Sequence, residues 1–174
     1  MNNIYTLLFQ KGDGDVVSSF DEWGIACCQV PFTDGDEMKD LPKRDWNDEH
    51  GEDVYFPKKL MAKAYDAVFE LAYVGKELAN NPFDVHLAQS QIAAFRKWLS
   101  GNDTENGSGT SLKIYSPYNR VGRQSCYLKS ISDKELHVQL KEESGNVYNE
   151  NIATFKAEFH VCDPTTDILL NYGT

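Results

Sequence analysis

The stretch KAYDAVFELAYVG, residues 63–75, constrains the fold of this chain more than any other segment. Apolar side chains fall at every second position along it: Tyr65, Ala67, Phe69, Leu71 and Tyr73. Successive side chains of a β-strand point to opposite faces of a sheet, so a period of two indicates a strand with one buried face. The stretch, which Gly75 closes, therefore predicts a long strand that lies over a core.

One amphipathic helix is predicted after that strand, within NNPFDVHLAQSQIAAFRKWLSG, residues 80–101. Its apolar positions recur at three- and four-residue spacing: Val85, Ala88, Ile92, Phe95 and Leu99. Asn81 followed by Pro82 is typical of a helix N-terminus, and Gly101 is typical of the end of a helix. His86 has no metal-ligating partner one turn on, so we expect it on the helix surface.

After residue 110, apolar and polar residues alternate as they do in β-strands. A turn is predicted at SDKE, residues 132–135. The expected strands are SLKIYS (111–116), QSCYLKSI (124–131), KELHVQLK (134–141), a weak strand in SGNVYNENI (144–152) and FKAEFHVC (155–162). His137 and His160 fall off the apolar faces, and we expect them on the surface, where they could face each other across two strands. Strands around one helix predict an α+β domain, either an antiparallel β-sandwich or a curled sheet with one α-helix packed on it.

We expect a single domain over residues 1–174, because this length supports one core. An irregular segment, 1–57, contains two strand candidates, IYTLLF (4–9) at a sheet edge and WGIACCQVPF (23–32). The core is expected over 58–165, and the tail, 166–174, is apolar enough to dock.

The formal net charge of −10 repels phosphate backbones and anionic lipid, which disfavours a nucleic-acid reader or a membrane-surface binder. No apolar run approaches the roughly twenty residues that span a membrane, and the N-terminus has no basic start. We therefore expect the chain to stay in the cytoplasm after synthesis. The cysteines (Cys27, Cys28, Cys126 and Cys162) lack zinc or redox spacing, so we expect reduced, mostly buried thiols.

The stretch DWNDEHGED, residues 45–53, has the carboxylate density of a calcium loop. A calcium loop that begins at Asp45 needs glycine at its sixth position and a glutamate at its twelfth. His50 and Phe56 occupy those positions, so the register fails twice. We therefore expect a solvated loop, no metal and no other cofactor.

Catalytic motifs for nucleophiles, zinc, dinucleotides or phosphates are absent from the sequence, and we expect no enzyme. The only basic and aromatic cluster is SPYNRVGRQSCY, residues 116–127. It could bind a phosphate or carboxylate, or it could contact the acidic loop of a neighbouring subunit, which the overall charge favours. The candidate contact residues are Tyr118, Arg120 and Arg123 on one side, with Tyr115 and Tyr127 as flanking tyrosines, and Asp45, Asp48 and Glu49 on the other.

Three features, in this order, resemble the N-terminal domain of distal tail proteins from long-tailed bacteriophages. They are DWNDEHGEDVYF running into KAYDAVFELAYVG, the helix QIAAFRKWLSG, and the strands SLKIYS and QSCYLKSI before FKAEFHVCDP. The resemblance covers about residues 20–165. It implies a strand pair that carries the acidic loop, a helix packed on a sheet, and late strands that close a sandwich akin to the tail-tube fold. Many such proteins carry a second, carbohydrate-binding-like domain, and we expect none in this chain.

The resemblance implies a non-catalytic structural ring, a hexamer, that joins the tail tube to the baseplate. Its partners would be copies of itself and other tail proteins, with no specific nucleic acid and no membrane, and its final place would be the virion tail of a phage or prophage. Tail-tube and tail-completion proteins fit the same features. A different class stays open: an acidic cytoplasmic ligand-binding domain or small enzyme with a dispersed site.

Overall fold

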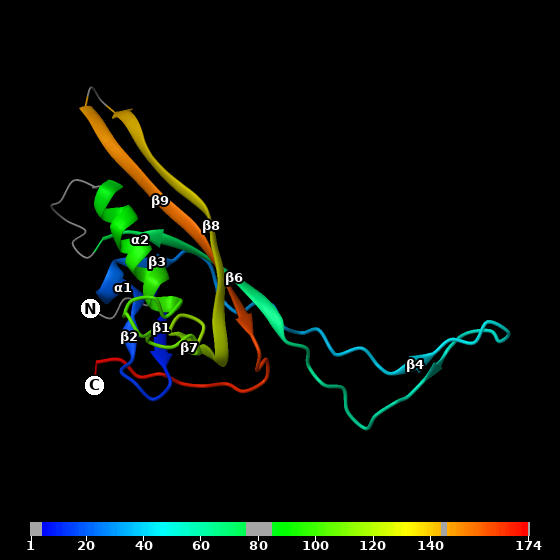
Figure 1. Cartoon of the computed structure of the whole chain (residues 1–174). Coiled ribbons are helices and arrows are strands. Elements are labelled where there is room, and N and C mark those ends of the chain that lie inside the picture. The colour runs from blue at the N-terminus through cyan, green and yellow to red at the C-terminus, as the bar shows by residue number, and fades with distance from the viewer. Residues whose placement is uncertain (1–4, 76–84, 144–145, 174) are drawn as a thin grey trace.

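The computed structural model describes residues 5–75, 85–143 and 146–173 (Figure 1). Its strands are β1 (Leu8–Lys11), β2 (Val17–Ser18), β3 (Ile25–Cys27), β4 (Lys43–Arg44), β5 (Asp53–Val54), β6 (Tyr65–Tyr73), β7 (Leu112–Ser116), β8 (Val121–Glu143) and β9 (Asn146–Val161). Its helices are α1 (Ser19–Trp23) and α2 (Val85–Leu99). Seven strands form one sheet in the order β2-β1-β7-β8-β9-β6-β3, and β4 pairs with β5.

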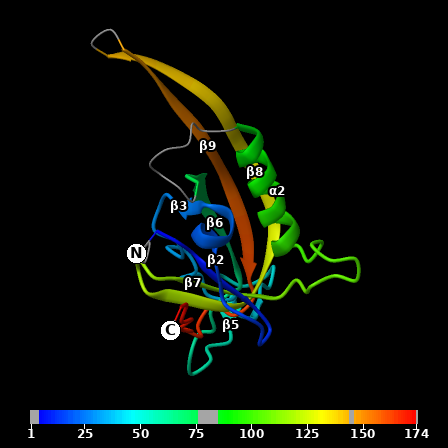
Figure 2. The same cartoon turned by 90° about the vertical axis from the view of Figure 1, so that its left-hand side faces the viewer.

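All pairs in the seven-stranded sheet are antiparallel, and α2 lies against one face of it (Figure 2). The α+β prediction of an antiparallel sheet with a helix packed on it is confirmed. Of the two architectures predicted, the structure adopts the curled sheet, because a single ladder of strands runs from β2 to β3. The short helix α1 was not predicted.

Strand β6 has the predicted faces. Ala67, Phe69 and Leu71 are buried, whereas Val68 and Glu70 between them are exposed. The strand pairs with β9 along its length, and each buried residue of β6 lies opposite a buried residue of β9. Helix α2 buries the predicted positions Ala88, Ile92, Phe95 and Leu99. Its predicted N-cap, Asn81, lies outside the described residues.

The end of α2 follows from Gly101. This glycine adopts φ +77°, a left-handed backbone conformation that residues other than glycine rarely take. The Asn102 N–H then reaches back to the Lys97 carbonyl at 2.8 Å, and the Gly101 N–H donates to the Trp98 carbonyl at 3.1 Å. This pair of bonds satisfies carbonyls that the helix end leaves without partners.

The predicted turn at 132–135 is wrong. β8 runs unbroken through these residues, and its pairing with β9 shifts between Ser132 and Glu135. Asp133 adopts φ +49° at this irregularity. A β-bulge accommodates extra residues and bends the strand without ending it, which explains why polar, turn-like residues occur inside β8.

β9 likewise joins two segments that the sequence separated, and it buries Phe155, Ala157, Phe159 and Val161 as predicted. The turn expected at Ser144–Gly145 lies outside the described residues. His137 pairs with Ile152, whereas His160 pairs with Tyr127 of β8 and Asp66 of β6. The two histidines therefore do not face each other, because the long ladder places them far apart along the strands.

The N-terminal segment supplies much of the core. Leu7, Phe9, Trp23 and Ile25 pack with the aromatic residues of β6, α2 and β9 in one cluster. β1 lies between β2 and β7, so the predicted edge position of the first strand is wrong. The pairing of β1 with β7 joins segments about a hundred residues apart, which local patterns do not reveal.

The tail docks on the sheet, as predicted. Ile168 donates its backbone N–H to the Gly122 carbonyl at 3.4 Å, and Leu170 is buried with Leu8 and Tyr115 in a second, smaller cluster. The sheet near β1 and β7 therefore has apolar residues buried on both of its faces.

Candidate interaction surface

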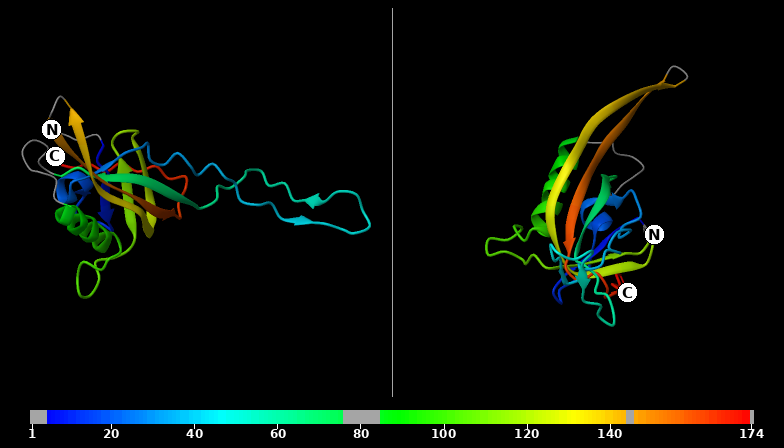
Figure 3. Two further views of the ribbon diagram at one scale, coloured as in Figure 1. Left: turned by 90° about the horizontal axis from the view of Figure 1, so that it is seen from above. Right: turned by 90° about the vertical axis from the view of Figure 1, so that its right-hand side faces the viewer.

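A two-stranded arm, residues 33–62, projects from one end of the sheet (Figures 1 and 3). Near its base, the Lys39 N–H donates to the Met61 carbonyl at 2.8 Å, and Lys63 pairs with Glu37 at 2.8 Å. β4 and β5 pair nearer the tip, where Lys43 also contacts Glu52 at 2.9 Å. These contacts hold the two chain segments of the arm side by side.

No side chain of the arm is buried. Six of its large apolar residues are exposed: Met38, Trp46, Tyr55, Phe56, Leu60 and Met61. Phe56 is 79% exposed and Tyr55 is 68% exposed. An isolated pair of strands is marginally stable in water, and exposed apolar residues in a group mark interaction sites. The arm therefore has the composition of a segment that contacts another surface.

The predicted contact residues Asp45, Asp48 and Glu49 lie at the tip of this arm and are exposed. Trp46 stands among them, 48% exposed. Within the described parts of the chain, no group of three or more His, Cys, Asp and Glu side chains is placed to hold a metal ion. The exposed surface of the tip therefore includes carboxylates and one large aromatic ring, that of Trp46.

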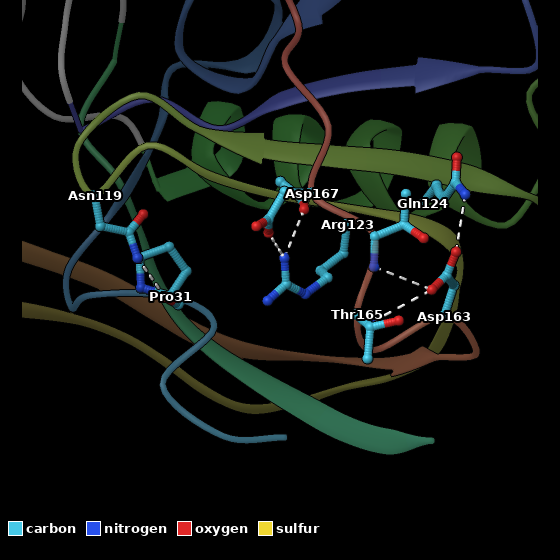
Figure 4. Close-up of polar contacts among 9 residues, drawn as sticks. Pro31, Asn119, Arg123, Gln124, Asp163, Thr165 and Asp167 are labelled. Carbon is cyan, nitrogen blue, oxygen red and sulfur yellow. Dashed lines mark hydrogen bonds and ion pairs between the residues drawn. The ribbon is translucent and has the colours of Figure 1, made fainter. Parts of the chain in front are cut away.

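The two predicted arginines are separated by the fold. Arg120 is exposed in the turn between β7 and β8, with φ +58°. Arg123 lies on β8 beneath the tail, where its guanidinium pairs with Asp167 and donates to the Gly122 carbonyl at 3.0 Å (Figure 4). The structure therefore assigns Arg123 to holding the tail, and leaves Arg120 as the exposed arginine of the cluster.

A second polar group fixes the start of the tail. Gln124 donates to the Asp163 carboxylate at 2.8 Å, and the Thr166 backbone N–H donates to it at 3.2 Å (Figure 4). The hydrogen bond from Gln124, followed by those from Thr166 and Thr165, lowers the pKa of Asp163 to about 2. These bonds favour the ionised carboxylate, so the stability that they give to the start of the tail depends on pH.

Another ionic cluster lies on the sheet face opposite α2. Lys129 contacts Asp66 at 2.6 Å and Glu158 at 2.9 Å, and His160 Nδ1 lies 2.6 Å from the other oxygen of Asp66. The hydrogen bond from Lys129, and then that from His160, lower the pKa of Asp66. The sequence placed His160 off the apolar face, and the strand register brings it next to Asp66 and Tyr127.

The thiols do not form a reactive pair within the described residues. Cys27 and Cys126 are buried, whereas Cys28 and Cys162 are exposed, which corrects the expectation of mostly buried thiols. Burial raises the pKa of Cys27 to about 11 and that of Cys126 to about 12. Both thiols therefore stay protonated and poorly nucleophilic at neutral pH.

The sequence analysis did not single out the apolar residues of the arm, although Val54, Tyr55 and Phe56 follow the acidic stretch directly. It named Tyr118 as a contact residue but missed the shelf that Tyr118 forms with Tyr5, Val30 and Pro31, where the arm leaves the body. The rings of Tyr5 and Tyr118 stack with centroids 5.7 Å apart. Beside them is a depression of about 110 Å³.

A wider hollow of about 440 Å³ lies over the end of β6 and the bulge of β8. Its charged lining residues are Glu70, Asp133, Lys134, Glu135 and Lys156. Ligand sites are mostly apolar with a few convergent polar groups, so this charged hollow does not resemble one.

Comparison with protein-family models, curated proteins and solved structures finds no match for this chain. None of the helices in the described parts of the chain is long and apolar enough to cross a membrane.

Proposed function

We propose that this chain is a tail structural protein of a phage or prophage, whose copies form a ring that joins the tail tube to the baseplate without catalysis. The observation that supports the proposal best is the arm: six large apolar side chains are exposed on a segment that buries none of its own. Such a segment gains stability when it lies against another surface, because burial of apolar area is favourable.

A ring of identical copies is the assembly that a chain with a projecting arm suits. The arm and the body are different surfaces of one chain, so an arm that contacts the next copy makes a head-to-tail contact. Head-to-tail contacts close into rings when the rotation between copies allows it. The acidic surface also fits a conduit, since like charge keeps a passing phosphate backbone from binding.

The experiment compares three forms of the full chain by sedimentation velocity and negative-stain electron microscopy over a wide range of concentration. The arm variant combines Trp46→Ser, Tyr55→Ser and Phe56→Ser. The control removes two large apolar side chains that are exposed on the body, through Leu87→Ser and Tyr127→Ser.

We expect rings from the wild-type chain and the control, and monomers from the arm variant. Assignment to a tail further requires that the genes beside this one encode tail proteins, and that co-expressed tube or baseplate proteins incorporate the chain. A wild-type chain that stays monomeric alone and is not incorporated by those partners would overturn the proposal.

A further inference from the structure

The shelf at the base of the arm is an exposed apolar surface on the body. Tyr5 is 53% exposed, Tyr118 is 51% exposed and Val30 is 42% exposed. The tyrosine rings are nearly parallel, with an interplanar angle of 25°. Stacked aromatic rings present a rigid, broad surface, and tyrosine is enriched where proteins contact each other.

The depression beside these rings is large enough for part of a side chain. Thr6, Cys27, Cys28 and Ser116 line it together with the shelf residues. An apolar cavity of about 150 Å³ holds a benzene ring. A depression of about 110 Å³ therefore admits one aromatic ring partway or one branched aliphatic side chain.

One basic residue, Arg120, follows the shelf residue Tyr118 in the turn between β7 and β8. Arg120 is exposed two residues after Tyr118. Residues 33–62 contain nine acidic and five basic residues, and the acids Asp45, Asp48 and Glu49 lie at the tip. Arginine pairs with carboxylates through two parallel hydrogen bonds, so Arg120 is suited to an acidic partner.

The shelf is also tied to the root of its own arm. Asn119 donates from Nδ2 to the Pro31 carbonyl at 2.7 Å, which joins the β7–β8 turn to the chain that leads into the arm (Figure 4). From there the arm projects away from the body of the chain (Figures 1 and 3). A contact of arm with shelf between copies therefore places each arm against the root of the next.

We propose that the shelf receives the arm of a second copy of this chain, with the aromatic residues Trp46, Tyr55 or Phe56 on the tyrosines and the tip carboxylates near Arg120. This inference rests on the proposed ring and names the surface that would build it. The excess of carboxylates on the arm disfavours an anionic lipid surface as the partner.

Photo-crosslinking of the full chain tests the contact. Phe56→p-benzoylphenylalanine places the reactive group on the most exposed aromatic residue of the arm. A mixture of ¹⁵N-labelled and unlabelled chains identifies adducts between copies, because their peptides carry both isotopes. We expect mixed-isotope adducts at residues 5–6, 27–31 and 116–120. Tyr118→Ala should reduce these adducts several-fold, whereas Tyr127→Ala, a tyrosine of comparable exposure, should leave them unchanged.

The outcomes separate the two proposals. Adducts that map to other surfaces, such as α2 or a second arm, in particles that still form rings would overturn the shelf contact and leave the ring in place. Absence of both mixed-isotope adducts and assembled particles would overturn the ring and the shelf contact together.

Discussion

The arm and the body of this chain place their aromatic residues in opposite surroundings. In the body, Phe9, Phe69, Phe95 and Phe159 are fully buried and contact one another within about 5–6 Å between ring centroids. In the arm, Trp46, Tyr55 and Phe56 are exposed. The same residue types therefore stabilise the fold in one region and are available for a partner in the other. Substitutions in the body should therefore lower the free energy of unfolding, whereas substitutions in the arm should weaken assembly.

The largest effect on stability is expected in the body. Phe159→Ala, and separately Phe95→Ala, should lower the free energy of unfolding by about 3–5 kcal/mol, because each removes a buried aromatic ring and leaves a cavity. Urea unfolding, followed by circular dichroism, measures the loss. A loss below about 1 kcal/mol at both positions would show that these rings do not share one core.

A smaller effect is expected where the tail crosses β8. A Cβ atom at Gly122 would lie 2.4 Å from the Ile168 carbonyl oxygen and 2.9 Å from the ring of Tyr115. Gly122→Ala should therefore displace the tail and cost about 1–3 kcal/mol, the usual range for overpacking. Hydrogen exchange should become faster over residues 163–173 and stay unchanged in α2. Wild-type exchange in the tail would contradict this packing.

A pH-dependent effect is expected at the start of the tail. The pKa of Asp163 is lowered from 3.8 to about 2, so its ionised form is stabilised in the folded state. This contribution is complete above the ordinary pKa of aspartate and is lost as pH falls from about 4 to about 2. Asp163→Asn should reduce the melting temperature above pH 4, and the difference from wild type should vanish near pH 2. A difference that is independent of pH would contradict the assignment.

The smallest effect on stability is expected in the arm. Phe56→Ala should change the free energy of unfolding by less than about 0.5 kcal/mol, as exposed substitutions usually do. The same substitution should weaken assembly, which sedimentation velocity measures. A large loss of stability in the monomer would show that the arm packs on its own body in solution.

The parts of the fold that the sequence predicted are those with a local period. β6 alternates over its whole length, and α2 repeats its apolar positions, so neither needs a distant partner to be identified. The position of β1 depends on pairing with β7, and the continuity of β8 depends on a bulge at Asp133. Polar residues at a bulge have the composition of a turn, and only the ladder distinguishes the two.

The candidate interaction surface was predicted in part. The acidic stretch was recognised as exposed, and its residues lie at the tip of the arm. The exposed aromatic residues beside it were not singled out, because apolar residues near a strand are usually core. Arg120 and Arg123 are close in sequence, but a turn and a strand direct them to different neighbours. The shelf joins residues from three distant segments, which no local pattern reports.

Hydrogen exchange of the full wild-type chain as a function of concentration tests most directly whether the arm is an assembly element. In dilute solution, we expect fast exchange over residues 33–62 and slow exchange in β6, β9 and α2. At concentrations that support assembly, exchange in the arm should slow markedly, while the strands and the helix change little. An arm that exchanges equally fast in the monomer and in assembled particles would show that the arm is not an assembly element.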